Sequence, residues 1–269
     1  MARRRDLDTV SFYATVSVLT GLGLVLLIAP TLVVLIVSFT SGSSLRFPPP
    51  GFSLKWYAAL GDAWQIKAAA WNSVEVALWT TVLSVLLGVS ASLAIARSRS
   101  ATAHVLDSLF MSPLVLPALA FGLSALMFFS LIGWAVSPLT LVLGHTVVCV
   151  PYVVRTTVGA LTQLDAALLE GSASLGAGRW YTFRRVTLPL IRPGILAGGF
   201  IAFMSSFDNI PVSLFLRGAD SELLPIRMWQ DLDNRLDVTI AAVSGVWIAF
   251  TAALMIAMER FASLSRRLR

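Results

Sequence analysis

Long apolar stretches alternate with shorter polar segments along this chain, and the apolar stretches predict its architecture. About 20 apolar residues are needed to cross the ~30 Å hydrocarbon core of a bilayer. Because backbone polar groups find no water inside lipid, each such stretch is expected to be a helix. The pattern predicts an all-α, polytopic membrane protein with six transmembrane helices, forming a single domain over residues 1–269. The six stretches run approximately over Tyr13–Thr40, Ala68–Ala96, Asp107–Leu131, Pro138–Leu161, Arg192–Leu216 and Asp237–Ala262.

Prolines interrupt several of these stretches. Pro113 and Pro117, four residues apart in the third stretch, predict a kinked or broken helix there. Pro30, Pro151 and Pro211 are tolerated in membrane helices where neighbouring helices cover the freed backbone groups. The first stretch is longer than the roughly 7–15 apolar residues of a secretory signal. It is therefore expected to remain as an uncleaved first span.

Composition supports a membrane environment. Only 13% of the residues are charged and the mean hydropathy is +0.82, whereas a soluble domain carries about 25% charged residues. The net charge of +6 does not predict nucleic-acid binding, because the basic residues flank apolar stretches and do not cluster. The single cysteine, Cys149, excludes an internal disulfide, and its apolar surroundings predict a buried, inert thiol.

The distribution of basic residues predicts the orientation of the chain, because cytoplasmic loops carry an excess of Lys and Arg. The richer side holds both ends of the chain, residues 1–11 and 260–269, so both termini are expected in the cytoplasm. That side also holds the segment Leu161–Pro193. Its basic residues are Arg3, Arg4, Arg5, Arg97, Arg99, Arg155, Arg179, Arg184, Arg185, Arg192, Arg260, Arg266, Arg267 and Arg269. The other side has Arg46, Lys55, Lys67, Arg217, Arg227 and Arg235.

The segment Leu161–Pro193 is unusually polar for this chain and has an amphipathic pattern of its own. Leucine recurs there at spacings of three, four and seven residues, which predicts an apolar stripe on a helix. Gly176 and Gly178 can end that helix, because glycine readily adopts the left-handed conformation of a C-cap. By amphipathicity alone, the helix could merely cap a bundle at the membrane surface. The leucines are Leu161, Leu164, Leu168 and Leu175.

The same segment contains a spaced motif. Glu170 is followed six residues later by Gly176 and, after nine intervening residues, by Val186, Leu188 and Pro189. This resembles the EAA loop of ATP-binding-cassette importer permeases, whose pattern is E-A-A, three residues, Gly, nine residues and I-x-L-P. Gly171 and Ser172 stand where the pattern has alanines, and Val186 stands where it has isoleucine. These replacements keep small residues small and the branched residue branched.

The resemblance implies the type I importer permease fold in a bacterial inner membrane. It also implies a coupling role for the loop, which in that family inserts into a cleft on the nucleotide-binding subunit. It also implies partners: a second permease subunit, usually a different chain and so a heterodimer, two cytoplasmic ATP-binding subunits and a periplasmic substrate-binding protein. The coupling residues so implied are Leu168, Glu170, Gly171, Ser172, Gly176, Val186, Leu188 and Pro189.

The chain has no phosphate-binding loop of its own. Its two lysines, Lys55 and Lys67, do not follow the Gly-x-x-x-x-Gly pattern of a phosphate cradle. The chain is therefore expected to be no enzyme and to hold no cofactor or metal. ATP and Mg are expected on the partner ATPase subunits.

Acidic residues inside membrane spans are costly and usually face a cavity or a partner. Glu75, Asp208 and Asp237 lie at similar predicted depths and could line a cavity for a cationic substrate. The alternative is that Asp208 bonds backbone freed by Pro211, while Glu75 and Asp237 sit at helix ends. Other candidate pathway residues are Ser205, Asn209 and Trp79.

The segment SFDNIPVSLFL, followed by LLPIRMW, is similar to the corresponding region of spermidine/putrescine importer permeases. This implies transport of polyamines or related small cationic compounds, although the class also includes permeases for opines, aminophosphonates and other small solutes. A rival interpretation is an ion-coupled transporter that uses Asp208. A membrane-embedded enzyme is disfavoured, because two histidines and one cysteine supply no converging catalytic set, and His104 is expected to be solvated.

Overall fold

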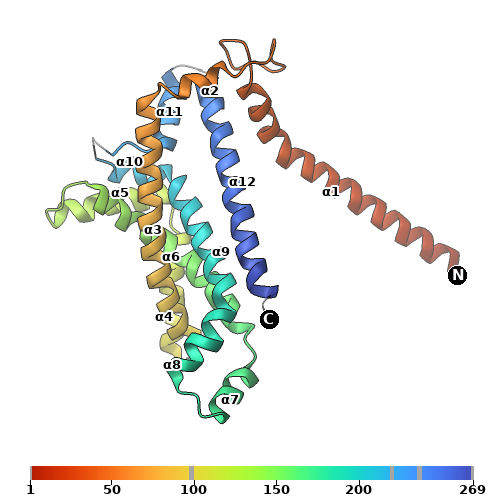
Figure 1. Ribbon diagram of the computed structural model, residues 1–269, viewed down its shortest axis with the longest axis vertical. Coiled ribbons are helices and arrows are strands. Elements are labelled where there is room, and N and C mark those ends of the chain that lie inside the picture. The colour runs from red at the N-terminus through yellow and green to blue at the C-terminus, as the bar shows by residue number, and fades with distance from the viewer. Residues whose placement is uncertain (1, 97–99, 219–220, 235–237, 268–269) are drawn as a thin grey trace. The chain divides into compact units, whose positions relative to one another are not determined.

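The computed structural model describes residues 2–96, 100–218, 221–234 and 238–267, and its regular elements are helical (Figure 1), which confirms the all-α prediction. The elements are α1 (Ala2–Ser38), α2 (Lys55–Leu60), α3 (Trp64–Ala96), α4 (Ala101–Met111), η1 (Ser112–Leu114), α5 (Ala118–Leu131), α6 (Pro138–Thr162), α7 (Ala166–Ser174), α8 (Arg179–Thr182), η2 (Phe183–Thr187), α9 (Leu188–Phe207), α10 (Ile210–Leu216), α11 (Leu224–Asn234) and α12 (Val238–Arg267).

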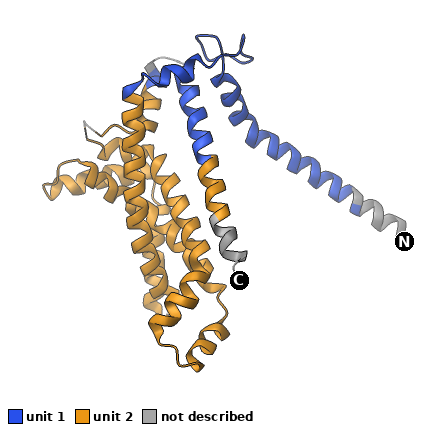
Figure 2. Ribbon diagram, viewed as in Figure 1, with its two compact units in different colours: residues 1–64, 231–251 blue, residues 65–230, 252–269 orange. Residues whose placement is uncertain are grey.

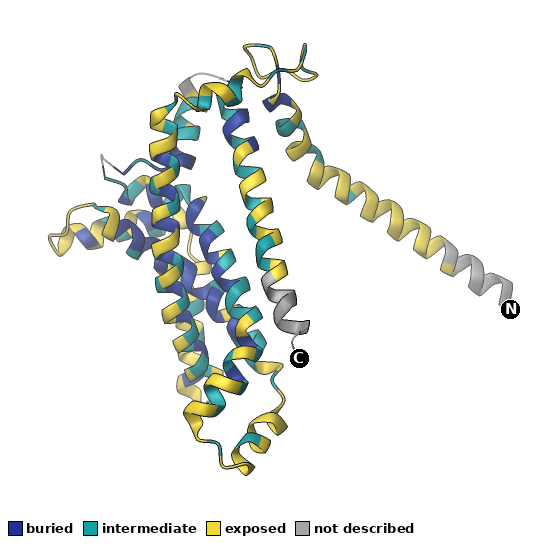
Figure 3. Cartoon of the chain, in the orientation of Figure 1, coloured by how far each residue is buried: buried dark blue, intermediate teal, exposed yellow. Residues whose placement is uncertain are grey.

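The chain divides into two compact units (Figure 2), and each is described by itself. The first comprises residues 1–64 and 231–251, and the second comprises residues 65–230 and 252–269. In the first unit, α1 is exposed along most of its length (Figure 3). The hydroxyls of Ser38 and Tyr57 hydrogen-bond at 2.7 Å, which ties the end of α1 to α2. The short helix α2 precedes α3 in the chain.

The second unit is organised around α6 and α9, which pack closely because small residues face one another. A Cβ at Gly198 of α9 would meet the Thr156 hydroxyl and would lie 2.9 Å from the Val153 Cα of α6. A Cβ at Gly88 of α3 would lie 2.7 Å from Val153 Cβ. Small residues at helix contacts let backbones approach, which is how membrane helices gain packing energy without a hydrophobic driving force. Cys149 is fully buried in this core, as expected.

The membrane spans agree with the predicted number. Five helices of the described residues are long and apolar enough to cross a bilayer, and a bent pair makes a sixth if it is one span. The pair joins Ala101–Leu114 to Ala118–Leu131 at an angle of 102°. Pro113 lies in the 3-10 turn η1 and Pro117 is the N-cap of α5, so the predicted break of the third span is confirmed.

The predicted fifth span, Arg192–Leu216, is wrong at both ends. The helical stretch runs over Arg179–Phe207, and α10 starts as a separate helix at Ile210. The Asn209 side chain accepts the Val212 N–H at 3.1 Å and so caps α10, while Pro211 in its first turn has no N–H to continue the helix before it. The hydropathy pattern misses the break because the residues on both sides of it are apolar.

Candidate functional site

The polar segment between α6 and α9 folds around the short helix α7. The Asp165 carboxylate accepts the Ala167 N–H at 2.9 Å and caps the start of α7. Gly176 has a φ of +78°, and its N–H donates to the Ala173 carbonyl at 2.9 Å. The next N–H, of Ala177, donates to Ser172 at 3.1 Å. A glycine in the left-handed region that closes the last carbonyls is a regular helix C-cap, so the predicted stop at Gly176 is confirmed.

The predicted leucine stripe is wrong as a single surface. Leu164 lines a hollow beside the bundle, whereas Leu168 is 47% exposed and Leu175 is 89% exposed. The stripe fails because α6 ends at Thr162 and α7 begins only at Ala166, so the leucines do not share one helix. Leu169 lines the hollow together with Leu164.

The second half of the motif lies on a continuous helical stretch. Val186 is in the π-helical turn η2, and Leu188 and Pro189 form the first turn of α9. Pro189 thus occupies the first turn of α9, whereas Pro193 lies inside that helix. The hydroxyls of Ser172 and Thr182 hydrogen-bond at 2.8 Å and so hold α7 to α8.

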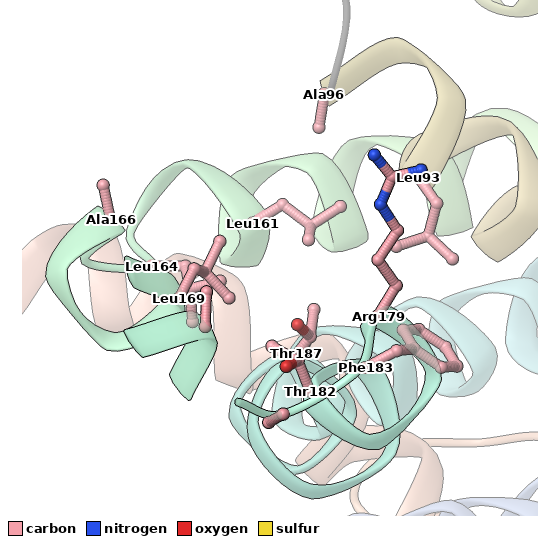
Figure 4. A pocket seen from close by; sticks show the side chains of 12 residues that line it. Leu93, Ala96, Leu161, Leu164, Ala166, Leu169, Arg179, Thr182, Phe183 and Thr187 are labelled. Atoms are coloured by element: carbon pink, nitrogen blue, oxygen red, sulfur yellow. The ribbon is translucent and has the colours of Figure 1, made fainter. Parts of the chain in front are cut away.

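A hollow of about 630 Å³ lies between α7 and the ends of α3 and α6 (Figure 4). Its wall is mostly apolar, and the polar groups among its lining residues are Arg179, Thr182 and Thr187. The apolar wall comes from Leu93, Ala96, Leu161, Leu164, Leu169 and Phe183, with three alanines of the segment. The segment is thus separated from the ends of α3 and α6 by this hollow.

The outer surface of the segment is exposed and partly apolar. Glu170 is exposed on α7, Leu175 is exposed just after it, and Trp180 and Tyr181 of α8 are 71% and 59% exposed. The rings of Trp180 and Phe183 lie 5.6 Å apart. Exposed aromatic and aliphatic groups beside a carboxylate are suited to contact with another protein.

The pathway candidates of α3 share one face of that helix. Trp71, Glu75 and Trp79 follow one another at spacings of four residues, and all three are exposed. Glu75 lies eleven residues inside α3, which begins at Trp64, so the alternative that it sits at a helix end is wrong. It is five residues from Thr80 at the middle of the helix, roughly 8 Å along the axis.

The candidates near the end of α9 take different roles. Asp208 is the C-cap residue of α9 and its side chain is exposed. Asn209, and not Asp208, bonds the backbone next to Pro211. Ser205 is half-buried, and the nearby Cys149 thiol donates to the Ala202 carbonyl at 3.5 Å. Asp237 lies outside the described residues.

Glu75 and Asp208 lie at the same level of the bundle. A Cβ at Gly199 of α9 would be 3.4 Å from Val85 and 3.8 Å from Thr81 of α3, and the two helices run in opposite directions (Figure 1). From that contact, Asp208 is nine residues along α9 and Glu75 six to ten residues back along α3. At ~1.5 Å per residue, both residues lie roughly 9–15 Å along their helix axes from the contact. No hydrogen bond joins the two side chains among the described residues.

A fully buried histidine, which the apolar pattern of the sequence does not reveal, holds the helix break. His145 of α6 hydrogen-bonds through Nδ1 to Ser206 Oγ and through Nε2 to Ser213 Oγ, both at 2.9 Å. The two serines stand on α9 and α10, on either side of the break at Asp208 and Asn209. The available signal was an imidazole inside an apolar run, since a buried polar group needs partners.

We expect His145→Ala to destabilise the protein more than His104→Ala. Removal of the buried ring leaves Ser206 and Ser213 without their partner, at a cost of about 1–3 kcal/mol for each unsatisfied group. His104 is exposed on α4 and serves as the matched control. The measurement is the melting temperature of the purified protein in detergent. Equal melting temperatures for the two variants would show that His145 does not hold the break.

Within the described residues, no group of three or more His, Cys, Asp or Glu side chains is placed to hold a metal ion. The arrangement contains an exposed helical segment, a helix break and a face with one carboxylate between two indoles. These features are suited to the binding of a ligand or a protein and to movement of the helices.

The spans and their arrangement define a multi-pass helical membrane protein, and similar solved structures have the fold of ATP-binding-cassette importer permeases. A bacterial alginate transporter in complex with its pentasaccharide-bound periplasmic protein matches with a TM-score of 0.69 and 16% identity, covering 96% of this chain and 94% of that chain. The inward-facing methionine transporter MetNI matches with a TM-score of 0.63 and 16% identity, covering 76% of this chain and 98% of that chain.

The chain belongs to the family described as binding-protein-dependent transport system inner membrane component, which matches residues 84–267. It is 26% identical to the spermidine/putrescine transport system permease protein PotC of Escherichia coli K12, over 86% of this chain and 88% of that protein. It is 30% identical to the putrescine transport system permease protein PotI of the same strain, over 83% and 82%. It is 33% identical to the molybdenum transport system permease protein ModB of Mycobacterium bovis, over 68% and 75%. The chain is thus a permease subunit of an importer.

Proposed function

We propose that this permease imports a small organic cation of the polyamine class and is driven by ATP-binding subunits that dock on α7. The observation on which the coupling role depends is the form of the segment around α7. Its helix is capped by Asp165 and stopped by Gly176, it is tied to α8 through Ser172, and its outer surface is exposed. A short rigid helix joined to the spans can transmit a rigid-body movement to them.

The partners follow from the same proposal. Two ATP-binding subunits hold ATP and Mg, because the chain has no phosphate-binding loop. A second permease subunit completes the pathway, and a periplasmic binding protein delivers the substrate. The excess of basic residues on the side of α7 supports an orientation in an inner membrane with both termini cytoplasmic. The coupling contacts are assigned to Leu168, Glu170, Gly171, Ser172, Gly176, Val186, Leu188 and Pro189.

The substrate class is proposed from the α3 face and from the names of two relatives, which transport spermidine or putrescine. With the middle of α3 placed at the bilayer midplane, Glu75 stands inside the ~15 Å half-thickness of the hydrocarbon core, where a carboxylate facing lipid is costly. Its face therefore borders the pathway. Trp71 and Trp79 on either side offer indole faces for a cation. Asp208 adds a second carboxylate at that level.

We expect ATP-dependent uptake of labelled putrescine by proteoliposomes that contain the complete complex, and none by the permease chain alone. Energy reaches the spans only through docked ATP-binding subunits, so the lone chain lacks its driving force. Vesicles with the complex but without ATP are the control.

An ion-coupled transporter is the second candidate, since Asp208 stands at a helix break, where many secondary transporters bind their coupling ions. Uptake by the lone chain that follows a proton or sodium gradient would support this candidate and contradict the ATP-driven function.

A further inference from the structure

The hollow between α7 and the bundle is not used by the coupling role, which concerns the outer surface of the segment. Its volume of about 630 Å³ falls in the range of roughly 300–1,000 Å³ that is common for small-molecule sites. Such sites are mostly apolar with a few polar groups that fix the ligand. The wall of leucine, alanine and phenylalanine with one guanidinium has this composition.

Among the described residues that line the hollow, the one charged side chain is basic. Arg179 begins α8, and its guanidinium extends across the hollow toward Leu93 of α3 (Figure 4). Among the described residues it forms no ion pair, so its charge is available to a ligand. Thr182 and Thr187, which also line the hollow, add hydroxyl groups. An occupant that matches this wall has an apolar body and an anionic group.

The position of the hollow selects among such occupants. Ala96 is the last residue of α3, and Leu161 lies one residue before the end of α6. The hollow is thus level with the ends of two membrane spans, where lipid headgroups meet acyl chains. Arg179 lies at this level, where a basic residue attracts anionic lipids.

We propose that the hollow binds an anionic phospholipid, whose acyl chain fills the apolar space and whose phosphate pairs with Arg179. The ligand contacts α3, α6, α7 and η2 at once, so it supports α7 from its inner side. The π-helical turn η2 contributes Phe183 and Thr187 to the wall, and π turns inside α-helical stretches often mark functional sites. The site does not depend on the identity of the transported solute.

The test uses the complete transporter complex in nanodiscs made either of palmitoyl-oleoyl phosphatidylglycerol or of phosphatidylcholine with the same chains. Native mass spectrometry then counts the lipid molecules that remain bound after release from the disc. We expect about fivefold stronger retention of phosphatidylglycerol by the wild type, the effect of one basic residue near the membrane surface. Arg179→Gln should abolish this preference, whereas Arg184→Gln, at an exposed arginine outside the hollow, should keep it.

A second pair of variants tests the apolar part. Ala96→Trp places a large ring in the hollow and should displace the lipid, whereas Ala94→Trp, two residues earlier at an exposed position outside the hollow, should not. Equal retention of the two lipids by the wild type, or equal retention by the two tryptophan variants, would overturn the proposal. Loss of the ATP-binding subunits from Ala96→Trp with lipid retention unchanged would also overturn it, because the hollow would then belong to the subunit interface.

Discussion

Gly176→Val should abolish uptake and separate the ATP-binding subunits from the permease, while the permease still inserts in the membrane. Gly176 has a φ of +78°, and open space surrounds the position of an added Cβ. The effect is therefore one of backbone conformation, which costs roughly 1–2 kcal/mol for a non-glycine residue and more for a β-branched one. Strain of this size frays the end of α7. We therefore expect about ten times less ATP-binding subunit to co-purify with the permease. The measurement is the ratio of ATP-binding subunit to permease after purification.

Gly159→Val is the matched control for this experiment. Gly159 lies in α6 near its end, a Cβ there also meets open space, and its φ is not positive. The control should retain uptake and subunit docking. If Gly176→Val co-purifies with as much ATP-binding subunit as Gly159→Val and transports normally, α7 is not the coupling element.

The end of α7 could be predicted from the sequence, because all the groups that form its C-cap lie within a few residues of one another. A glycine that takes a left-handed conformation and two backbone bonds to the preceding turn make the cap. The same holds for the break of the third span, where Pro117 directly starts a new helix. In both cases the residue that decides the structure also stands out in the sequence.

The break between α9 and α10 could not be predicted from hydropathy, because the partners that stabilise it are distant in sequence. Ser206 and Ser213 bond to His145, 61 and 68 residues earlier. Hydropathy averaged along the sequence is high at both Phe207 and Ile210, and it therefore predicts one continuous helix across them. The leucine stripe failed for a related reason, since its regular spacing crosses the gap between α6 and α7.

The pathway residues show a further limit of sequence reasoning. Residue counts along α3 and α9 from the contact at Gly199 put Glu75 and Asp208 at similar distances from it, whereas their depth in a bilayer stays a prediction. Which face of α3 is exposed could not be predicted from the sequence, because both the indoles and the buried small residues recur at helical spacing. Burial separates them: Ser73, Ala77 and Ser84 are buried, while Trp71, Glu75 and Trp79 are exposed.

Glu75→Gln should lower the uptake of a cationic substrate by the complete complex about tenfold or more, mainly through a higher KM. A hydrogen bond to a charged group contributes about 1.5–3 kcal/mol, which corresponds to roughly ten- to hundredfold in affinity. The amide keeps the size of the side chain, so the change removes charge alone. Trp79→Leu should have a smaller effect in the same direction, because a cation–π contact contributes about 0.5–2 kcal/mol.

Asp62→Asn is the control for the loss of one negative charge, since Asp62 is exposed between α2 and α3, outside the span. It should leave KM unchanged. ATPase activity stimulated by the binding protein is measured in parallel, because coupling through α7 should survive Glu75→Gln. An unchanged KM for putrescine in Glu75→Gln, with ATP-dependent uptake intact, would remove Glu75 from the pathway and leave the transport function standing. A loss of stimulated ATPase activity together with uptake would instead assign the α3 face to contact with the second permease subunit.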